Sequence, residues 1–181
     1  MKKFVSVIFL AVLLSSCGTM YYPVAPEKNK IFLSSAFNVN QAQFINKKGN
    51  NTLKGESFLK TVGGDVKTCA GNEVHLIPVT DYSNERMIKQ FGKSQSGYIT
   101  DYTFIMTEFV NTDANYTEYQ KTTYCNSQGG FIFENLSDGE YYVTTIVKWQ
   151  GGYPMTTQGG VIMKRIAVKD GETKSVYVLA E

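Results

Sequence analysis

The chain has 181 residues, of which 43% are hydrophobic, 13% aromatic and 19% charged. This is enough for one domain of ordinary size, and the composition is that of a globular protein rather than a disordered or collagen-like one. A formal charge of +2 excludes a strongly basic nucleic-acid-binding surface, and one histidine with three cysteines argues against a multi-ligand zinc site, so we expect no nucleic-acid partner, no metal and no cofactor.

The first sixteen residues have the pattern of an export signal. Lys2 and Lys3 form a positive start, and an almost unbroken apolar run follows over 4–14. A run of this length suits the core of a signal peptide and is too short to span a bilayer as a helix. Residues 14–17, Leu-Ser-Ser-Cys, resemble a bacterial lipobox, which implies cleavage before Cys17 and attachment of diacylglycerol to its sulfur. The alternative is an ordinary secretory signal with an incidental cysteine.

The residue after Cys17 is Gly18 rather than an aspartate, and the resemblance to enterobacterial lipoproteins then favours the outer membrane. The mature domain would face either the periplasm or the exterior. Because the signal peptide takes Lys2 and Lys3 with it, the remaining chain carries equal numbers of acidic and basic side chains. The expected partners are membrane lipid, through the acyl chains on Cys17, and an unidentified protein of the envelope.

The other two cysteines, Cys69 and Cys125, are interpreted in the light of export. Outside the cytoplasm, two cysteines left after lipidation most simply form a disulfide. The loop that it closes would contribute about 4 kcal/mol at most. The alternative is a pair of free thiols, and a redox role is disfavoured because the chain has no Cys-x-x-Cys spacing.

We expect residues 17–50 to contain the lipidated cysteine, a tether and a short helix. Residues 18 to about 35 include Pro23 and Pro26, and a flexible segment of that length spans roughly 20–25 Å. Asn38 can then cap a short helix that ends near Gly49.

From residue 51 to 181 the pattern is mainly that of a β protein. The candidate strands are rich in Val, Ile, Thr, Tyr and Phe. They are Thr52–Lys60, Asp65–Thr68, Glu73–Val79, Ile99–Val110, Tyr116–Cys125, Phe131–Glu134, Tyr141–Trp149, Val161–Val168 and Ser175–Leu179. Alternation predicts that one face of the Tyr141–Trp149 strand meets the core, namely Tyr141, Val143, Thr145, Val147 and Trp149. Glycine pairs such as Gly159-Gly160 predict turns, and residues 82–91 predict a short helix.

The stretch GFIFENLSDGEY, residues 130–141, contains the pattern F-x-F-x-x-L-x-x-G-x-Y after a glycine. It resembles the signature of carboxypeptidase-regulatory-like domains, which have a transthyretin-like (prealbumin-like) β-sandwich. Phe131 and Phe133 would share one face, Leu136 would close the end of the core, and Gly139 would permit the turn. Residues 71–80 resemble an early strand of the same family. The resemblance implies a single transthyretin-like or Ig-like β-sandwich of about seven strands with one or two short helices, and a non-catalytic accessory, surface or adhesion module.

Candidate catalytic and metal-binding residues are few. His75 could act as a base beside Glu73 and Asp81, or it could be a structural or surface histidine. No G-x-S-x-G motif accompanies it, so we predict no catalytic residues and no enzymatic activity. The acid pairs Asp65/Glu73 and Asp113/Glu118 lack the spacing of a calcium loop and fit solvated turn charges.

Aromatic side chains offer a second kind of site. The middle of the chain is rich in them, which fits either an adhesive surface or half-buried strand faces. They are Tyr98, Tyr102, Phe104, Tyr116, Tyr119 and Tyr124. The loop Gln150–Gly160, with Tyr153, Pro154 and Met155, is the expected exposed contact loop, unless it is an ordinary hairpin connection.

These observations together predict a lipoprotein anchored at the outer membrane that acts as a non-catalytic structural or binding module. Two alternatives stay open. One is a lipoprotein component of a secretion or envelope assembly, by analogy with the type VI secretion membrane complex, whose outer-membrane lipoprotein shares the fold class. The other is a hydrolase that uses His75.

Overall fold

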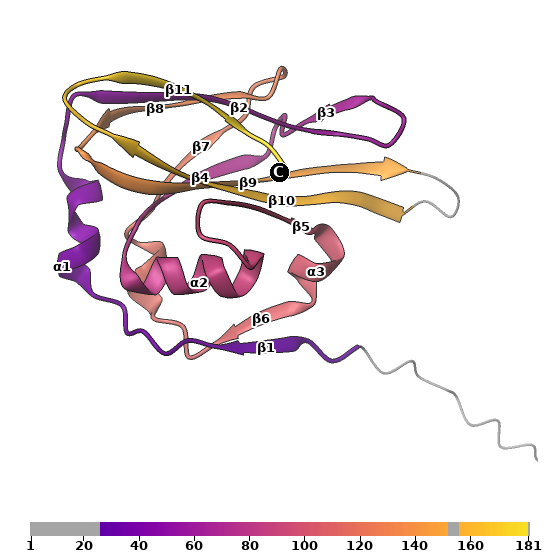
Figure 1. Cartoon of the computed structure of the whole chain (residues 1–181), viewed down its shortest axis with the longest axis horizontal. Coiled ribbons are helices and arrows are strands. Elements are labelled where there is room, and N and C mark those ends of the chain that lie inside the picture. The colour runs from indigo at the N-terminus through magenta and orange to yellow at the C-terminus, as the bar shows by residue number, and fades with distance from the viewer. Residues whose placement is uncertain (1–25, 152–155, 181) are drawn as a thin grey trace, which may run out of the picture.

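The computed structural model describes residues 26–151 and 156–180, and their fold is mainly β, as predicted. The sandwich consists of a five-stranded and a four-stranded sheet, against the expected total of about seven strands (Figure 1). In the first sheet the order is β5 (Ser96–Thr100), β10 (Thr156–Val168), β9 (Gly139–Gly151), β4 (Glu73–Pro78) and β7 (Lys121–Tyr124). In the second, β2 (Asn51–Lys60) pairs with β11 (Thr173–Val178), β3 (Val66–Thr68) and β8 (Gly130–Leu136).

The main core lies between the two sheets. Tyr141, Val143 and Val147 are 0% exposed and belong to it, which confirms the predicted face of β9. Phe131, Phe133 and Leu136 also lie in this core, where the sequence placed them. Leu53, Leu76, Ile162 and Val178 complete it from the other strands. The alternating pattern therefore predicts the interior of the sandwich correctly.

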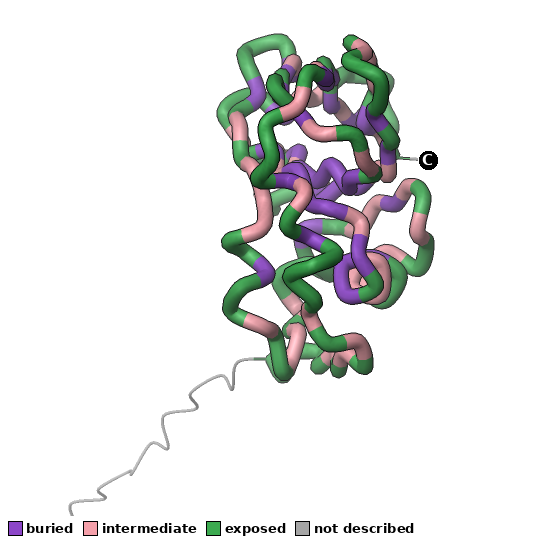
Figure 2. Tube along the Cα trace, turned by 90° about the vertical axis from the view of Figure 1, so that its left-hand side faces the viewer, coloured by how far each residue is buried: buried purple, intermediate pink, exposed green. Residues whose placement is uncertain are grey.

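The outer face of the five-stranded sheet is also covered. Helix α2 (Asp81–Phe91), close to the predicted range 82–91, lies across that face. On the same side are α3 (Asp101–Ile105), β1 (Asn29–Phe32) and β6 (Thr107–Val110) (Figure 1). Tyr142, on the opposite face of β9 from Tyr141, packs there with Tyr82, Met87 and Met163. Figure 2 shows buried residues in both regions of the domain. The domain thus has three layers rather than two.

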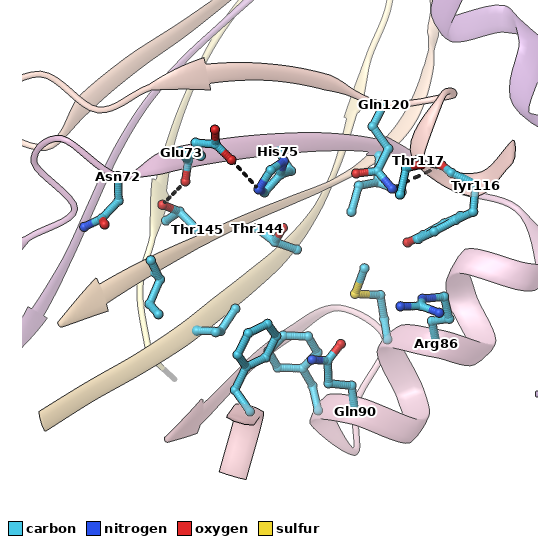
Figure 3. Close-up of a pocket in the computed structure, with 16 residues that line it drawn as sticks. Asn72, Glu73, His75, Arg86, Gln90, Tyr116, Thr117, Gln120, Thr144 and Thr145 are labelled. Atoms are coloured by element: carbon cyan, nitrogen blue, oxygen red, sulfur yellow. Dashed lines mark hydrogen bonds and ion pairs between the residues drawn. The ribbon is translucent and has the colours of Figure 1, made fainter. Parts of the chain in front are cut away.

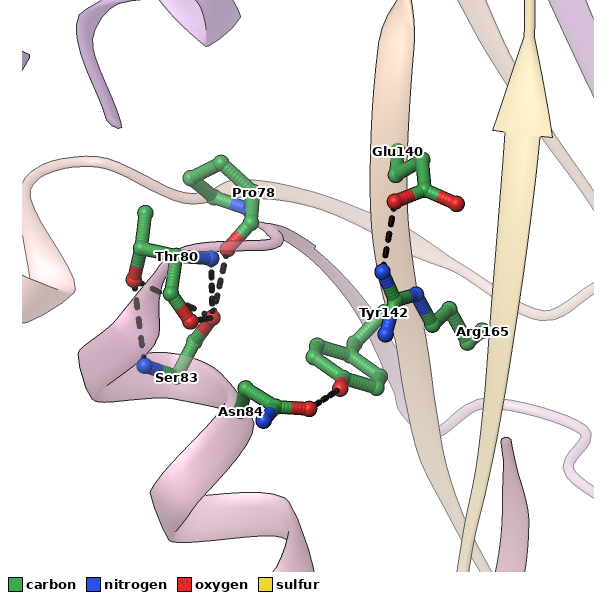
Figure 4. Close-up of polar contacts among 7 residues, drawn as sticks. All are labelled: Pro78, Thr80, Ser83, Asn84, Glu140, Tyr142 and Arg165. Carbon is green, nitrogen blue, oxygen red and sulfur yellow. Dashed lines mark hydrogen bonds and ion pairs between the residues drawn. The ribbon is translucent and has the colours of Figure 1, made fainter. Parts of the chain in front are cut away.

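Capping interactions fix where α2 begins (Figure 4). The Thr80 hydroxyl accepts a hydrogen bond from the Ser83 amide at 3.1 Å, and the Ser83 hydroxyl accepts one from the Thr80 amide at 2.8 Å. This capping box satisfies amides that the first turn leaves without partners. Tyr142 donates to the Asn84 side chain at 2.7 Å, so the helix is also tied to the sheet beneath it.

At the other end of α2, the Phe91 side chain packs closely on β5. Gly97 on β5 lies so near Phe91 that a Cβ on Gly97 would be 2.6 Å from the Phe91 Cβ. Only glycine allows that approach without a shift of the helix.

The N-terminal segment corrects the expected tether. Residues 29–32 form β1, which pairs in parallel with β6 (Thr107–Val110). The amides of Ser34 and Ser35 donate to the Glu85 carboxylate at 2.8 and 2.7 Å. Asn38 caps α1 (Val39–Ala42), as predicted, and a 3-10 turn over 43–46 continues it. The segment available as a tether is therefore shorter than the predicted range of 18 to about 35.

Two predicted strands are wrong in part. Ile99–Val110 is interrupted because the Thr100 hydroxyl accepts from the Thr103 amide and starts α3 (Asp101–Ile105). Tyr116–Cys125 begins instead with a 3-10 turn, Ala114–Thr117, and only Lys121–Tyr124 is strand. Local side-chain caps outweigh β propensity at both places.

Gly159-Gly160 is not a turn either, because it lies inside β10. Gly159 has a φ of +101°, and a Cβ on Gly160 would be 1.9 Å from the Ile99 carbonyl oxygen. The pair marks a close approach to β5.

Cys69 and Cys125 form the predicted disulfide, with Cα atoms 5.7 Å apart. Cys69 follows β3 of one sheet, and Cys125 follows β7 of the other, so the bond links the two sheets. Both residues are buried in the main core. In the described ranges, no helix has the length and apolar character needed to cross a membrane.

We predict that loss of this disulfide destabilises the domain without abolishing its fold. Replacing both Cys69 and Cys125 with serine should lower the free energy of unfolding by about 2–4 kcal/mol, because the unfolded chain regains the entropy that the cross-link removes. Urea denaturation would measure the loss. Exported protein, denatured without reductant, should show no thiol at either residue, and two titratable thiols would contradict the bond.

A second prediction concerns the pH dependence of the N-terminal segment. Lys89, at 2.9 Å, and the amides of Ser34 and Ser35 hold the pKa of Glu85 well below its ordinary value. The stabilisation is therefore complete above the unfolded-state pKa of about 4.3 and is lost as the pH falls below it toward the folded-state pKa. Hydrogen exchange should show protection of 34–35 falling between pH 6 and pH 3.

The variant Glu85→Gln should lower that protection at pH 6 as well, because a neutral amide binds Lys89 and the two backbone amides less strongly. Glu134→Gln, at an exposed position of β8, is the matched control and should change nothing. Equal protection at both pH values in the unmodified protein would contradict the role given to Glu85.

Candidate functional site

A cavity of about 490 Å³ lies between the five-stranded sheet and the layer that covers it (Figure 3). Its floor is a row of side chains on the outer face of the sheet. His75 on β4 pairs in register with Thr144 on β9, and Thr144 pairs with Met163 on β10. Period-two alternation brings residues 73, 75 and 77 of β4 to this face. Side chains of α2, α3 and the 3-10 turn after β6 form the remaining walls.

One end of the cavity is aromatic and cationic. The Arg86 guanidinium carbon is 4.7 Å from the centre of the Tyr116 ring and 3.9 Å from that of Phe109. Tyr116 is only 7% exposed, and burial raises its pKa to about 12, against the opposing effect of the Arg86 charge. Its hydroxyl is therefore neutral at physiological pH. Phe91 and Phe104 add two further rings to the wall.

The other end holds an ordered polar cluster. His75 Nε2 lies 3.5 Å from the Glu73 carboxylate, and His75 Nδ1 lies 3.2 Å from the Thr122 hydroxyl. Tyr124 donates to the other carboxylate oxygen of Glu73 at 3.0 Å, and this hydrogen bond raises the pKa of Tyr124. The side chains of Glu73 and His75 are 49% and 37% exposed, so solvent screens their attraction. Both ring nitrogens of His75 therefore face a protein group, and the cluster fixes the orientation of the ring.

The remaining candidate acids are separate from this cavity. Asp81 accepts from the Gln41 amide at 2.7 Å, so it does not join Glu73 and His75. Asp65 pairs with Lys67 at 3.7 Å, and Asp113 accepts from the backbone of Asn115. No group of three or more potential metal ligands occurs within residues 26–151 and 156–180.

The aromatic residues singled out in the sequence divide between interior and surface. Tyr116 is buried, Tyr119 packs against Phe37, and Tyr98 donates to the Gly159 carbonyl at 3.0 Å. The others are exposed. They are Tyr102, Phe104 and Tyr124. Of the exposed three, Phe104 lines the cavity.

Two predicted sites lie outside the described residues. They are Cys17 and the loop residues Tyr153, Pro154 and Met155. The expected loop Gln150–Gly160 is shorter than predicted, because β9 extends to Gly151 and β10 starts at Thr156. Lipidation of Cys17 and binding by the loop stay predictions.

The sequence interpretation missed the residues of α2 that face the cavity. Arg86, Met87, Gln90 and Phe91 all line it. Their spacing of three to four positions, which puts them on one side of a helix, is the signal that could have found them.

Comparisons with known proteins identify a shared fold. No family model matches the chain, and no curated protein does. A candidate carbohydrate-binding protein of Pseudomonas aeruginosa has a similar structure, with a TM-score of 0.65 and 18% identity, over 80% of this chain and 98% of the other. A minor pilin of Streptococcus agalactiae gives a TM-score of 0.36 and 13% identity, over 73% of this chain and 44% of the other. The first likeness confirms the β-sandwich; the resemblance to carboxypeptidase-regulatory-like domains stays a prediction as to family.

Proposed function

We propose that this chain is a non-catalytic saccharide-binding module, held at the outer membrane by lipid on Cys17. The cavity between α2 and the sheet is the observation that carries the proposal. It combines the rings of Phe91, Phe104 and Tyr116 with amide and hydroxyl groups. A sugar ring has apolar C–H faces that pack on aromatic rings and hydroxyls that bond to amides and hydroxyls, so the lining fits it.

The polar groups of the cavity come from several elements. Gln90 lies on α2, Gln120 precedes β7, and Thr144 lies on β9. Elements on different sides of the cavity hold these groups, so a ligand can be contacted from several directions at once. The fold shared with the Pseudomonas aeruginosa protein supports the same class of ligand.

The proposed anchor would keep the domain close to the membrane. β1 starts at Asn29, so eleven residues separate it from Cys17, and a linker of that length would span on average about 20 Å if it were flexible. The alternative of a secretion or envelope assembly has no specific contact in its favour. The hydrolase alternative has only His75, whose two nitrogens already face Glu73 and Thr122.

We predict that Phe104→Ala lowers saccharide affinity about tenfold, the effect of losing roughly 1.4 kcal/mol of contact. Phe104 is 42% exposed, so its removal should leave the domain folded. An oligosaccharide array would first identify a sugar that the mature protein binds. Calorimetric titration would then measure the affinity of the protein and of the variant for that sugar.

Tyr102→Ala is the matched control. Tyr102 lies on the same helix, is 71% exposed and does not line the cavity. This variant should bind like the unmodified protein. The proposal would be wrong if no oligosaccharide bound, or if Phe104→Ala and the unmodified protein had equal affinity.

A separate prediction tests the anchor. Cys17→Ser should move the protein from the membrane fraction to the soluble fraction, because the acyl chains supply the membrane affinity. Mass spectrometry of the N-terminal peptide from the unmodified protein should show a lipidated Cys17. An unacylated full-length product in the cytosol would refute the lipoprotein assignment.

A further inference from the structure

Arg86 is half-buried, and no carboxylate of the described residues neutralises its charge. Its Nη1 atom is buried and has no hydrogen-bond partner within the described residues. The guanidinium instead lies against the rings of Phe109 and Tyr116. Its neighbour Glu85 is engaged elsewhere, with Lys89 and the amides of Ser34 and Ser35. No ion pair joins Arg86 to a carboxylate of residues 26–151 or 156–180.

Arg165, the other arginine of the chain, differs from Arg86 because it has a carboxylate partner. Arg165 also has a buried nitrogen, Nε, without a hydrogen-bond partner and lies 5.9 Å from the Tyr142 ring, but it forms an ion pair with Glu140 at 2.5 Å (Figure 4). Aromatic rings attract a cation but offer no acceptor in the plane of a guanidinium. Arg86 is half-buried and lines the cavity without an anionic partner, so a carboxylate bound beside it would form the ion pair that the described residues do not supply.

Because Arg86 lines the cavity, an anion bound there can reach it. Figure 3 shows Arg86 at one end, near Tyr116 and on the helix that also presents Gln90, whereas Glu73 lies toward the other end. The Glu73 carboxylate would repel a second negative charge placed next to it. An anionic group is therefore favoured only at the Arg86 end.

We propose that the ligand of this cavity is an acidic saccharide, a sugar that bears a carboxylate, with the carboxylate on Arg86 and the ring against Phe104. This inference rests on the proposed saccharide-binding function. A carboxylate fits better than a phosphate, because Arg86 is the sole lysine or arginine in the wall that the described residues form. A planar guanidinium also matches a carboxylate with two parallel hydrogen bonds.

The test compares an oligogalacturonate with its methyl ester, which has the same sugar rings without the charge. Calorimetric titration of the full mature protein should show the acid binding at least tenfold more tightly than the ester. The preference should shrink as salt increases. In Arg86→Gln the acid should lose ten- to a hundredfold in affinity, while the affinity for the ester should stay the same.

Arg165→Gln is the matched control, because it removes the arginine near the Tyr142 ring, outside the cavity. It should keep the full preference for the acid. A cooperative thermal transition of Arg86→Gln should show that the variant is folded, so that a loss of acid binding is not a loss of fold. Unchanged binding of the acid by Arg86→Gln would make Arg86 a packing residue and overturn the inference.

The outcomes separate the two proposals. If acid and ester bind equally, or if only neutral sugars bind, the acidic ligand is wrong and the saccharide-binding function stands. If no saccharide binds at all, the proposed function fails, and this inference fails with it.

Discussion

The structure depends on the burial of both faces of strand β9. Tyr141 and Val143 point into the sandwich, while Tyr142 points at α2, so the strand has a run of buried residues over 141–145. A strand in an antiparallel sandwich commonly has one face in water. Here a helix covers that face, and Thr144, which would otherwise be solvated, becomes part of a cavity floor. The cavity exists because α2 contacts the sheet around Tyr142 and leaves space over Thr144 and His75.

The same helix connects the cavity with the N-terminal segment. Glu85 faces β1 and binds the amides that follow it, whereas Arg86, the next residue, faces the cavity. Successive residues of a helix are about 100° apart around its axis, so one turn can serve both purposes. Lys89 strengthens the outer contact by pairing with Glu85 and donating to the Phe32 carbonyl. Ser34 and Ser35, which the sequence analysis assigned to a tether, thus bind α2, the helix that forms one wall of the cavity.

The parts that the sequence predicts are those with a local signal. Alternation identifies the core face of β9, and the compartment implied by the export signal pairs Cys69 with Cys125. The pairing of β1 with β6 has no local signal, because the two strands are far apart in the chain. The break at Thr100 is decided by a single capping hydroxyl within a β-like pattern.

The candidate site is predictable only in part for the same reason. Glu73 and His75 share a strand face by simple alternation, and the structure brings them together at 3.5 Å. The surroundings of Arg86 come from Phe109 and Tyr116, on segments more than a helix length away in sequence. No periodicity of α2 alone could show that Arg86 lies among three aromatic rings without a carboxylate partner.

The charged side chains of the cavity are unevenly distributed between its two ends. A glutamate at position 90 would lie one helical turn from Arg86 and offset its charge. The chain has Gln90 there and Gln120 in the opposite wall, both with the shape of glutamate and no charge. Glu73, at the other end, already has His75 and Tyr124 as partners. The Arg86 end of the cavity therefore carries an uncompensated positive charge, whereas the charge of Glu73 at the other end is compensated. A ligand with hydroxyls and a single acidic group has the matching chemistry.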